Sequence, residues 1–305
     1  MSRSILFFLA FFVSTLIANA QVEGNAKRET RLLDLADFSE LRVQIEANMI
    51  IDCQEEPRLE ITTDANLFEY LEIETKGNIL ILKQKENIKP TRGIQISLGA
   101  KDMAVLQTGA AATIQVVGID REDFRLVNPG ATVLLEGKTE ELRLAIEVGQ
   151  VEASRLNTER AVVDIWSSGI ATINASEKVS GKISNGGRLI YHGSPEIVNT
   201  NTSEGGITLA VQHENEENTQ GARFAADAPI QVSVINKTGA FLQTVVRGPG
   251  LKPFSYGLPF QPGITREENW PVGTKVFLVN KMGMRSLLFE VQASDQGGEI
   301  VLAGG

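Results

Sequence analysis

The chain of 305 residues has a single cysteine, Cys53, so no disulfide can form within it. A small secreted scaffold held together by disulfides is thereby excluded, and stability has to come from buried apolar surface and backbone hydrogen bonds. Cys53 follows the apolar residues Met49, Ile50 and Ile51. That setting is typical of a small core residue rather than of a nucleophile.

Clustered basic residues are also missing, and the formal net charge is -9 at pH 7. Binding to nucleic acid or to an anionic membrane needs a basic footprint, so neither is an expected partner. The only histidines, His192 and His213, are far apart and have no cysteine partners. A zinc site is therefore not expected, and neither is any other metal or cofactor.

Nucleotide and serine-hydrolase motifs are absent as well. Gly137-Lys138-Thr139 resembles the end of a phosphate-binding loop, but Thr132 stands where that loop needs its first glycine. No Gly-x-Ser-x-Gly elbow occurs anywhere in the chain. These absences remove two large classes of enzyme.

What the chain does have begins at its amino terminus. Arg3 precedes an apolar run from Ile5 to Leu16, and Ala18-Asn19-Ala20 follows it. A positive charge, a short apolar core and a small-x-small exit make up a secretory signal peptide, with cleavage after Ala20. The apolar run is shorter than the roughly 20 residues that span a bilayer. Residues 1–20 therefore predict export to the periplasm, the cell surface or the medium, with no transmembrane segment after cleavage.

Apolar and polar residues alternate with a period of two in several segments, which predicts half-buried strands. The alternating residues are Leu41, Val43 and Ile45; Leu59 and Ile61; Leu71 and Ile73; and Ile94, Ile96 and Leu98. Lys76-Gly77-Asn78 predicts a turn that joins residues 71–75 to residues 79–82 as antiparallel strands. No part of the mature chain sustains a helical apolar pattern over several turns. The sequence predicts an all-β fold.

Similar units recur about every twenty residues between Met103 and Glu196, each a strand, a glycine corner and a second strand. The corner glycines are Gly109, Gly130, Gly149, Gly169 and Gly187, spaced by 21, 19, 20 and 18 residues. Ordering about 20 residues costs roughly 20 to 40 kcal/mol of backbone entropy, whereas each buried aliphatic side chain returns only about 1.5 to 3 kcal/mol. One unit cannot fold alone, so the units must stack on one another.

The stacking favours a β-helix or solenoid-like stack of about five 20-residue coils, preceded by antiparallel strands. At the corners we expect the glycines to adopt positive φ. The alternative is an ordinary sandwich whose hairpins happen to be evenly spaced.

The pattern changes after Pro195. Residues 212–223 are polar and acidic, as an interdomain linker should be. Residues 224–305 contain several short alternating segments separated by proline and glycine turns. They predict a carboxy-terminal module that is a small β-sandwich or barrel.

Catalysis on a coil scaffold would need paired carboxylates at a fixed separation, or a calcium-binding cluster. No Asp-Asp pair occurs, and Asp120-Arg121-Glu122-Asp123 falls where we predict a solvated loop between coils. Glu136, Glu147 and Asp164 have different offsets from the corner glycines, so they do not share a column. The sequence predicts a protein that is not an enzyme.

Several segments together resemble the putative autotransporter adhesin, head GIN domain family, found in exported proteins of Gram-negative bacterial envelopes. The segments are Phe38-Ser39-Glu40-Leu41-Arg42-Val43, the Leu106 to Ala110 corner and its repeats, and Leu189-Ile190-Tyr191-His192-Gly193-Ser194-Pro195. The resemblance covers roughly Asp34 to Val198 and implies a non-catalytic, β-helix-like domain over residues 34–211. Asn128-Pro129-Gly130 and Val148-Gly149-Gln150 depart from the small-residue corner of the family. The carboxy-terminal residues resemble a module often attached to it. The family offers no established site residues.

Aromatic residues make up only 6% of the chain, and extended sugars and peptides are gripped by aromatic platforms. The candidate ligand-binding residues are Trp166, Tyr191, Phe254, Tyr256 and Trp270. The alternative for each is core packing, favoured more for Trp166 than for Trp270, because turn-rich surroundings place Trp270 nearer the surface.

The sequence as a whole predicts an exported, non-catalytic envelope protein: an adhesin or glycan-binding surface protein whose partner is a cell-surface glycan or an envelope protein. Two alternatives stay open. One is a polysaccharide-degrading enzyme on a β-helix scaffold, and the other is a structural protein of envelope assembly.

Overall fold

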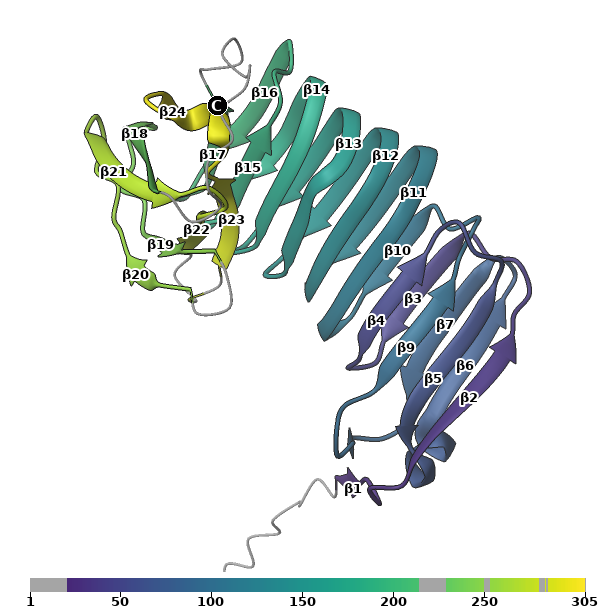
Figure 1. The fold of residues 1–305 in the computed structure, drawn as a ribbon. Coiled ribbons are helices and arrows are strands. Elements are labelled where there is room, and N and C mark those ends of the chain that lie inside the picture. The colour runs from purple at the N-terminus through teal and green to yellow at the C-terminus, as the bar shows by residue number, and fades with distance from the viewer. Residues whose placement is uncertain (1–20, 214–228, 250–252, 280–282, 284, 305) are drawn as a thin grey trace, which may run out of the picture.

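The fold was analysed in a computed structural model that describes residues 21–213, 229–249, 253–279, 283 and 285–304 (Figure 1). The predicted signal peptide, residues 1–20, lies outside the described residues, and so do residues 214–223 of the predicted linker. In the part of the chain that is described, no helix is long and apolar enough to cross a bilayer. Strands dominate, as the alternating sequence predicts.

Four long, bent strands form the centre of the molecule: β11 (Ala110–Asn128), β12 (Gly130–Ile146), β13 (Gln150–Ile165) and β14 (Ile170–Ile183). Each runs along one side of the core, turns, and runs along the opposite side. Neighbouring coils pair in parallel, so that Leu126 lies beside Leu144 and Leu144 beside Val163. This parallel register confirms the predicted stack of coils and excludes the sandwich of evenly spaced hairpins for this region (Figure 1).

The amino-terminal strands extend both sides of the stack. On one side lie β6 (Leu71–Lys76), β7 (Ile79–Gln84), β3 (Glu40–Gln44) and β10 (Val105–Thr108). On the other lie β2 (Arg28–Asp34), β5 (Arg58–Asp64), β9 (Gln95–Gly99) and β4 (Asn48–Asp52). The outer strands pair antiparallel, while β3 and β4 pair in parallel with the stack. The predicted hairpin at Gly77 is confirmed, and Gly77 has φ +61°.

Three short elements complete this end: β1 (Val22–Glu23) pairs with β8 (Ile88–Lys89), and a 3-10 helix, η1 (Ala65–Tyr70), follows β5. One continuous apolar core fills the space between the two sides, from Phe38 to Ala210. Cys53 is a buried member of that core, as its apolar surroundings predict.

The corner glycines are needed for a different reason from the one predicted. Gly109, Gly149, Gly169 and Gly187 do not have a positive φ, so that expectation is wrong for these four. A Cβ on Gly169 would lie 2.6 Å from Ile146 Cγ2, and one on Gly187 would lie 2.6 Å from Ile165 Cγ2. The preceding coil approaches so closely at this corner that a side chain has no room.

The stack ends with β15 (Arg188–His192) and β17 (Ile207–His213) on one side and β16 (Ile197–Thr202) on the other. β17 pairs antiparallel with β24 (Glu299–Gly304). The sheet continues through β18 (Pro229–Lys237) to β21 (Thr265–Pro271). One side of the stack therefore runs without interruption into the carboxy-terminal strands.

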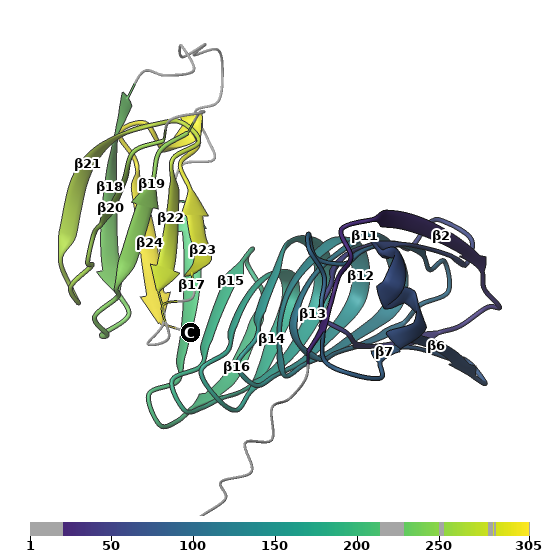
Figure 2. The ribbon, with the colours of Figure 1, turned by 90° about the horizontal axis from the view of Figure 1, so that it is seen from below.

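A second sheet faces this extension, in the order β20 (Ser255–Gly257), β19 (Thr244–Arg247), β22 (Lys275–Val279) and β23 (Arg285–Glu290). Buried residues from both sheets form one apolar cluster that includes Val232, Phe260, Trp270 and Phe289. Of the predicted sandwich or barrel, the described strands form a sandwich of two sheets (Figure 2). A short 3-10 helix, η2 (Ala293–Asp295), precedes β24.

The sandwich also packs against the flank of the stack. The hydroxyls of Thr172 on β14 and Ser286 on β23 lie 2.6 Å apart, and Thr172 Oγ1 lies 3.3 Å from the Leu287 carbonyl oxygen. Ile190, Leu209 and Val211 of the stack belong to the core of the sandwich. The stack and the sandwich share one sheet through the pairing of β17 with β24. The predicted division of the chain into domains of residues 34–211 and 224–305 stays a prediction.

Candidate functional site

Along the edge where the coils bend, the backbone forms continuous strands instead of the predicted loop. Asp120, Arg121 and Asp123 were expected in a solvated loop, but they lie within β11 and pair with Lys138, Thr139 and Glu141 of the next coil. The loop prediction is wrong, because the backbone stays extended through the bend and keeps its parallel partners. Side chains at one position of successive coils therefore form rows along this edge.

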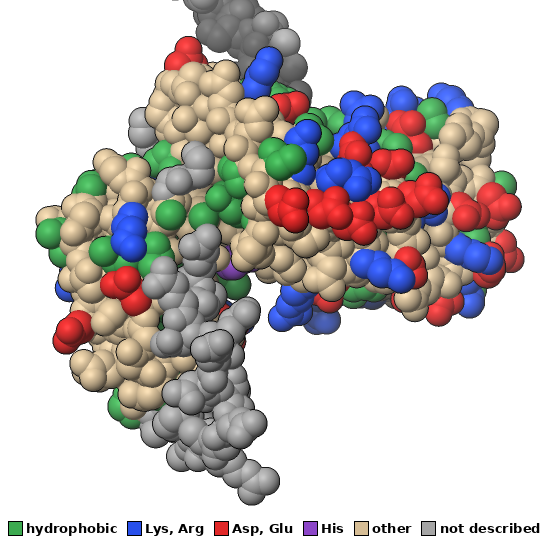
Figure 3. All heavy atoms as spheres, turned by 90° about the horizontal axis from the view of Figure 1, so that it is seen from above, with side chains coloured by type: hydrophobic (Ala, Val, Ile, Leu, Met, Phe, Trp, Pro, Cys, Tyr) green, Lys and Arg blue, Asp and Glu red, His purple; other side chains and the backbone are tan. Residues whose placement is uncertain are grey.

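One such row is acidic and contains Glu122, Glu140, Glu159 and Glu177, one from each of four successive coils; we call it the acidic row. All four side chains are exposed. Neighbouring strands lie about 4.8 Å apart, so like charges in such a row repel one another. Figure 3 shows acidic side chains in a line along the stack, with basic side chains on both sides of it.

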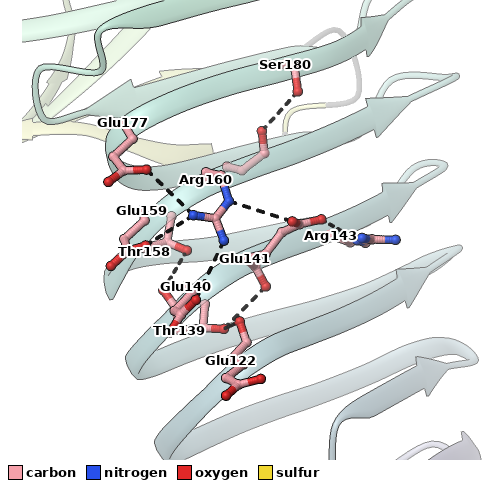
Figure 4. Close-up of polar contacts among 11 residues, drawn as sticks. Glu122, Thr139, Glu140, Glu141, Arg143, Thr158, Glu159, Arg160, Glu177 and Ser180 are labelled. Atoms are coloured by element: carbon pink, nitrogen blue, oxygen red, sulfur yellow. Dashed lines mark hydrogen bonds and ion pairs between the residues drawn. The ribbon is translucent and has the colours of Figure 1, made fainter.

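Arg160 offsets part of that repulsion (Figure 4). Its guanidinium lies 3.2 Å from a carboxylate oxygen of Glu159, 3.6 Å from Glu177 and 3.7 Å from Glu140. Glu141 lies 3.8 Å away and is also bound by Arg143, at 2.6 Å. Burial lowers the pKa of Arg160, but the surrounding carboxylates outweigh it, so the net shift of its pKa is upward.

A groove of about 630 Å³ runs beside the acidic row. Its lining contains Glu122, Glu140 and Glu159 together with hydroxyl and amide groups. Thr158 donates its hydroxyl to the Thr139 carbonyl oxygen at 3.2 Å, and Asn174 donates to Asn157 Oδ1 at 3.1 Å. The groove is polar, and in the described part of the chain no group of three or more His, Cys, Asp or Glu side chains is placed to hold a metal ion.

A second hollow, of about 290 Å³, lies between the stack and the sandwich and is lined in part by Leu134, Phe277 and Leu287. The Glu152 carboxylate is also in its lining. Burial raises the pKa of Glu152, and hydrogen bonds from Ser154 only partly oppose the shift. This carboxyl group is therefore harder to ionise than a solvated one.

Three of the sequence-predicted aromatic residues come together on the sandwich. Phe254 and Tyr256 are about two-fifths exposed, at 41% and 40%. Their rings stack at 5.9 Å between centroids and 25° between planes. Trp270 lies behind them, 1% exposed, and its indole nitrogen donates to the Tyr256 hydroxyl at 2.8 Å. We call Phe254 and Tyr256 the aromatic pair.

The other two candidates, Trp166 and Tyr191, are not brought together. Trp166 follows β13 and is 44% exposed, whereas Tyr191 on β15 is buried in the core of the stack. The expectation that Trp270 lies nearer the surface than Trp166 is wrong. Trp270 is on the face of β21 that packs against the second sheet, where it contacts Phe289 at 6.3 Å between ring centroids.

Sequence reasoning missed the acidic row and Arg160, although a signal for the row was present. Glu122, Glu140, Glu159 and Glu177 are spaced by 18, 19 and 18 residues, close to the spacing of the corner glycines. The sequence analysis compared Glu136, Glu147 and Asp164, which occupy other positions of the coil. Glu136 pairs with Arg155 at 3.4 Å.

The geometry defines a class of protein: an all-β chain of stacked parallel coils that presents rows of side chains and an exposed aromatic pair. The chain belongs to the family described as putative auto-transporter adhesin, head GIN domain, which matches residues 37–195. The resemblance inferred from the sequence is thereby confirmed. No curated protein matches the chain.

The chain is similar to several solved structures. A putative adhesin from Bacteroides fragilis is 17% identical to this chain and has a TM-score of 0.52. The match covers 61% of this chain and 98% of the Bacteroides fragilis chain. A putative lipid binding protein from Parabacteroides distasonis is 21% identical with a TM-score of 0.40, over 63% and 100%. A putative adhesin from Parabacteroides merdae is 17% identical with a TM-score of 0.39, over 62% and 98%. The likeness to the Bacteroides fragilis protein, at 17% identity, concerns the fold alone.

Proposed function

We propose that this chain is an exported adhesin of the cell envelope that binds a glycan, without catalysis, through the aromatic pair Phe254 and Tyr256. The observation that carries the proposal is the stacking of these two rings while each stays about two-fifths exposed. Two stacked aromatic rings form a flat apolar surface, which a single exposed ring such as Phe241 does not. A ligand with an apolar face can cover that surface.

The aromatic pair is held open by its surroundings. Phe254 lies over Gly248, where a Cβ would collide with its ring, and the Gly248 amide donates to the Phe254 carbonyl oxygen at 2.8 Å. Tyr256 is fixed by its hydrogen bond with Trp270. A platform fixed in advance loses little conformational entropy when a ligand binds.

The chemistry of the aromatic pair suits a sugar. A pyranose ring has an apolar face of C–H groups that can lie on an aromatic ring, and its hydroxyls need polar partners nearby. The Tyr256 hydroxyl provides one such group at the platform. Trp166, exposed on the stack, is proposed as a separate and weaker contact, while Trp270 supports the platform from behind.

The proposal is tested on a glycan array and on envelope extracts with residues 21–305. The double variant Phe254→Ala/Tyr256→Ala should lose binding by more than about tenfold, because the stacking surface is removed. The matched control is Phe241→Ala, which removes an aromatic ring of the sandwich that is 56% exposed. It should bind as the wild type does.

Two results would sink the proposal: absence of binding by the wild type to any glycan, or equal binding by the double variant. Release of reducing ends or unsaturated products from polysaccharides would contradict its non-catalytic part and favour the enzyme alternative.

A further inference from the structure

The hollow between the stack and the sandwich has apolar walls from both parts of the chain. The stack contributes Leu134 on β12, and the second sheet contributes Phe277 on β22 and Leu287 on β23. β23 is the strand of that sheet that lies next to the stack (Figure 2). All three side chains are half-buried, so each still offers apolar surface to the hollow. Sites for small molecules typically combine such walls with a few polar groups.

Glu152 on β13 lies where these walls meet. Its strand neighbours are Leu134 of the preceding coil and Thr172 of the next one. Thr172 in turn bonds to β23. The Ser154 amide donates to the Glu152 carboxylate at 3.3 Å, and the Leu287 amide donates to it as well. One carboxylate is therefore held against an apolar surface at the junction of stack and sandwich.

The two cations that line the hollow already have acidic partners. Arg155 lies 3.4 Å from Glu136, and Lys275 lies 3.4 Å from Glu290. Glu152 has hydrogen-bond donors but no ion pair among the described residues, and the attraction of Arg155 is the smallest of the effects on its pKa. Burial raises that pKa, as it does for a carboxylate without a counter-charge. An ionised Glu152 therefore leaves the hollow with an excess negative charge.

We propose that the hollow binds a small amphipathic amine, with its ammonium group on the Glu152 carboxylate and its apolar part between Leu134 and Phe277. The ligand supplies the positive charge that the carboxylate lacks, and opposite charges attract more strongly away from water. An ionised carboxylate accepts about four hydrogen bonds, so one from the ligand can be added. The volume of about 290 Å³ is near the lower limit of ligand pockets, about 300 Å³, so the apolar part is a short chain or a single ring.

An anionic ligand fits this charge pattern less well. To reach Arg155 and Lys275 it has to displace the carboxylates of Glu136 and Glu290. It would also bring a negative charge close to Glu152, which like-charge repulsion opposes. A neutral ligand would leave Glu152 without a counter-charge. The charges of the hollow therefore favour a cation.

The affinity for such an amine should depend on pH. An alkylammonium keeps its proton up to about pH 10, so in acidic and neutral solution the change comes from the protein. Below its ordinary pKa of 4.5 Glu152 is protonated, and the affinity should rise as the pH increases through its raised pKa. Glu136, Arg155 and Lys275 also face the hollow, and the variant Glu152→Gln separates their influence from that of Glu152.

The test is an NMR titration of residues 21–305 with hexylammonium, hexanol and hexanoate, which share one alkyl chain and differ in their head group. The methyl signals of Leu134 and Leu287 report on the hollow. At neutral pH we expect hexylammonium to bind at least about tenfold more tightly than the other two, because only its head group can pair with a carboxylate.

Glu152→Gln should weaken the binding of hexylammonium at least about tenfold and remove its pH dependence, while thermal unfolding checks that the fold is retained. The matched control is Glu147→Gln, at an exposed residue outside the hollow, which should bind as the wild type does. Phe254→Ala/Tyr256→Ala should bind hexylammonium normally as well, so this test is independent of the glycan proposal. Three results overturn the proposed site: no saturable shift with hexylammonium, equal or tighter binding of hexanol or hexanoate, or an unchanged affinity in Glu152→Gln.

Discussion

The indole nitrogen of Trp270 lies 2.8 Å from the hydroxyl oxygen of Tyr256 and connects the core of the sandwich to its exposed aromatic pair. Trp270 is buried, while Tyr256 is two-fifths exposed. The hydrogen bond therefore does two things: it satisfies a buried donor, and it fixes the orientation of a surface ring.

The substitution Tyr256→Phe separates these two roles. It removes the acceptor of a buried N–H but keeps the ring, so we expect the free energy of unfolding to fall by about 1–3 kcal/mol. Urea denaturation measures this loss. The control is Tyr70→Phe, at a half-buried tyrosine of η1 that follows the exposed Glu69, which should change stability by less than about 0.5 kcal/mol. Equal losses for the two substitutions would show that the hydrogen bond from Trp270 makes no particular contribution to the free energy of unfolding.

Gly149→Ala tests the close approach at the corner. The new Cβ would lie 2.7 Å from the Ala131 carbonyl oxygen and would collide with the Asn128 side chain. Asn128 is buried and bonds to Ala131 through both its oxygen, at 2.8 Å, and its nitrogen, at 2.9 Å. Displacing this amide leaves buried polar groups unpaired, so we expect a loss of about 3 kcal/mol.

Thermal and urea unfolding of Gly149→Ala should be compared with Gly257→Ala. At Gly257 the nearest atom to a new Cβ is the Thr244 carbonyl oxygen, at 3.9 Å, so the change should be within about 0.5 kcal/mol. If Gly149→Ala were as stable as this control, the packing explanation of the corner glycines would be wrong.

Arg188→Met should stabilise the protein. The Nε and Nη1 atoms of Arg188 on β15 are buried and have no hydrogen-bond partner in the described structure, and burial lowers the pKa of its guanidinium. Replacing a partly buried, unpaired charge by an apolar side chain of similar length should gain about 1–2 kcal/mol. Calorimetric melting measures the gain, and Arg155→Met, at a side chain that is 74% exposed, serves as the control. A lower melting temperature for Arg188→Met would contradict this account.

Glu152→Gln should change how stability depends on pH. Burial raises the pKa of Glu152 above its ordinary value of 4.5, so the folded chain holds this proton more tightly than the unfolded chain does. The stability that this provides is fully present below pH 4.5 and is lost as the pH rises through the raised pKa. Glutamine cannot ionise and does not incur that loss.

Glu152→Gln should therefore be more stable than the wild type at neutral pH, and the difference should disappear below about pH 4.5. Urea unfolding at a series of pH values measures it. Glu147→Gln, which makes the same substitution at an exposed residue, is the control. A difference that grows toward low pH would have the wrong sign for a raised pKa.

The stack could be predicted from the sequence because every coil repeats the same pattern of strand, corner glycine and strand. The corner glycines recur with near-constant spacing, and a unit of about 20 residues cannot bury its apolar face alone. The reason that a glycine is needed at these corners could not be predicted, because it depends on how closely Ile146 and Ile165 of the preceding coil approach.

The acidic row was missed because Glu122 was assigned to a loop, where no register is expected. Once the bend is extended backbone, residues 18 or 19 apart must lie side by side, as Glu122 and Glu140 do. The sequence also could not predict that Trp166 is more exposed than Trp270, for a different reason. It depends on which face of β21 meets the second sheet, and no repeat reports that pairing.

The pairing of β17 with β24 was equally hidden, because it joins segments about 90 residues apart in sequence without any shared periodicity. The sequence therefore predicts the sandwich as a separate module but contains no signal for the sheet that it shares with the stack.

The central claim is that the aromatic pair binds a glycan, and calorimetric titration tests it most directly. The glycan with the strongest array signal is titrated into the wild type, Tyr256→Ala and Phe241→Ala. We predict that Tyr256→Ala weakens binding by more than about tenfold, while Phe241→Ala binds as the wild type does. Equal affinities for the wild type and Tyr256→Ala would contradict the claim.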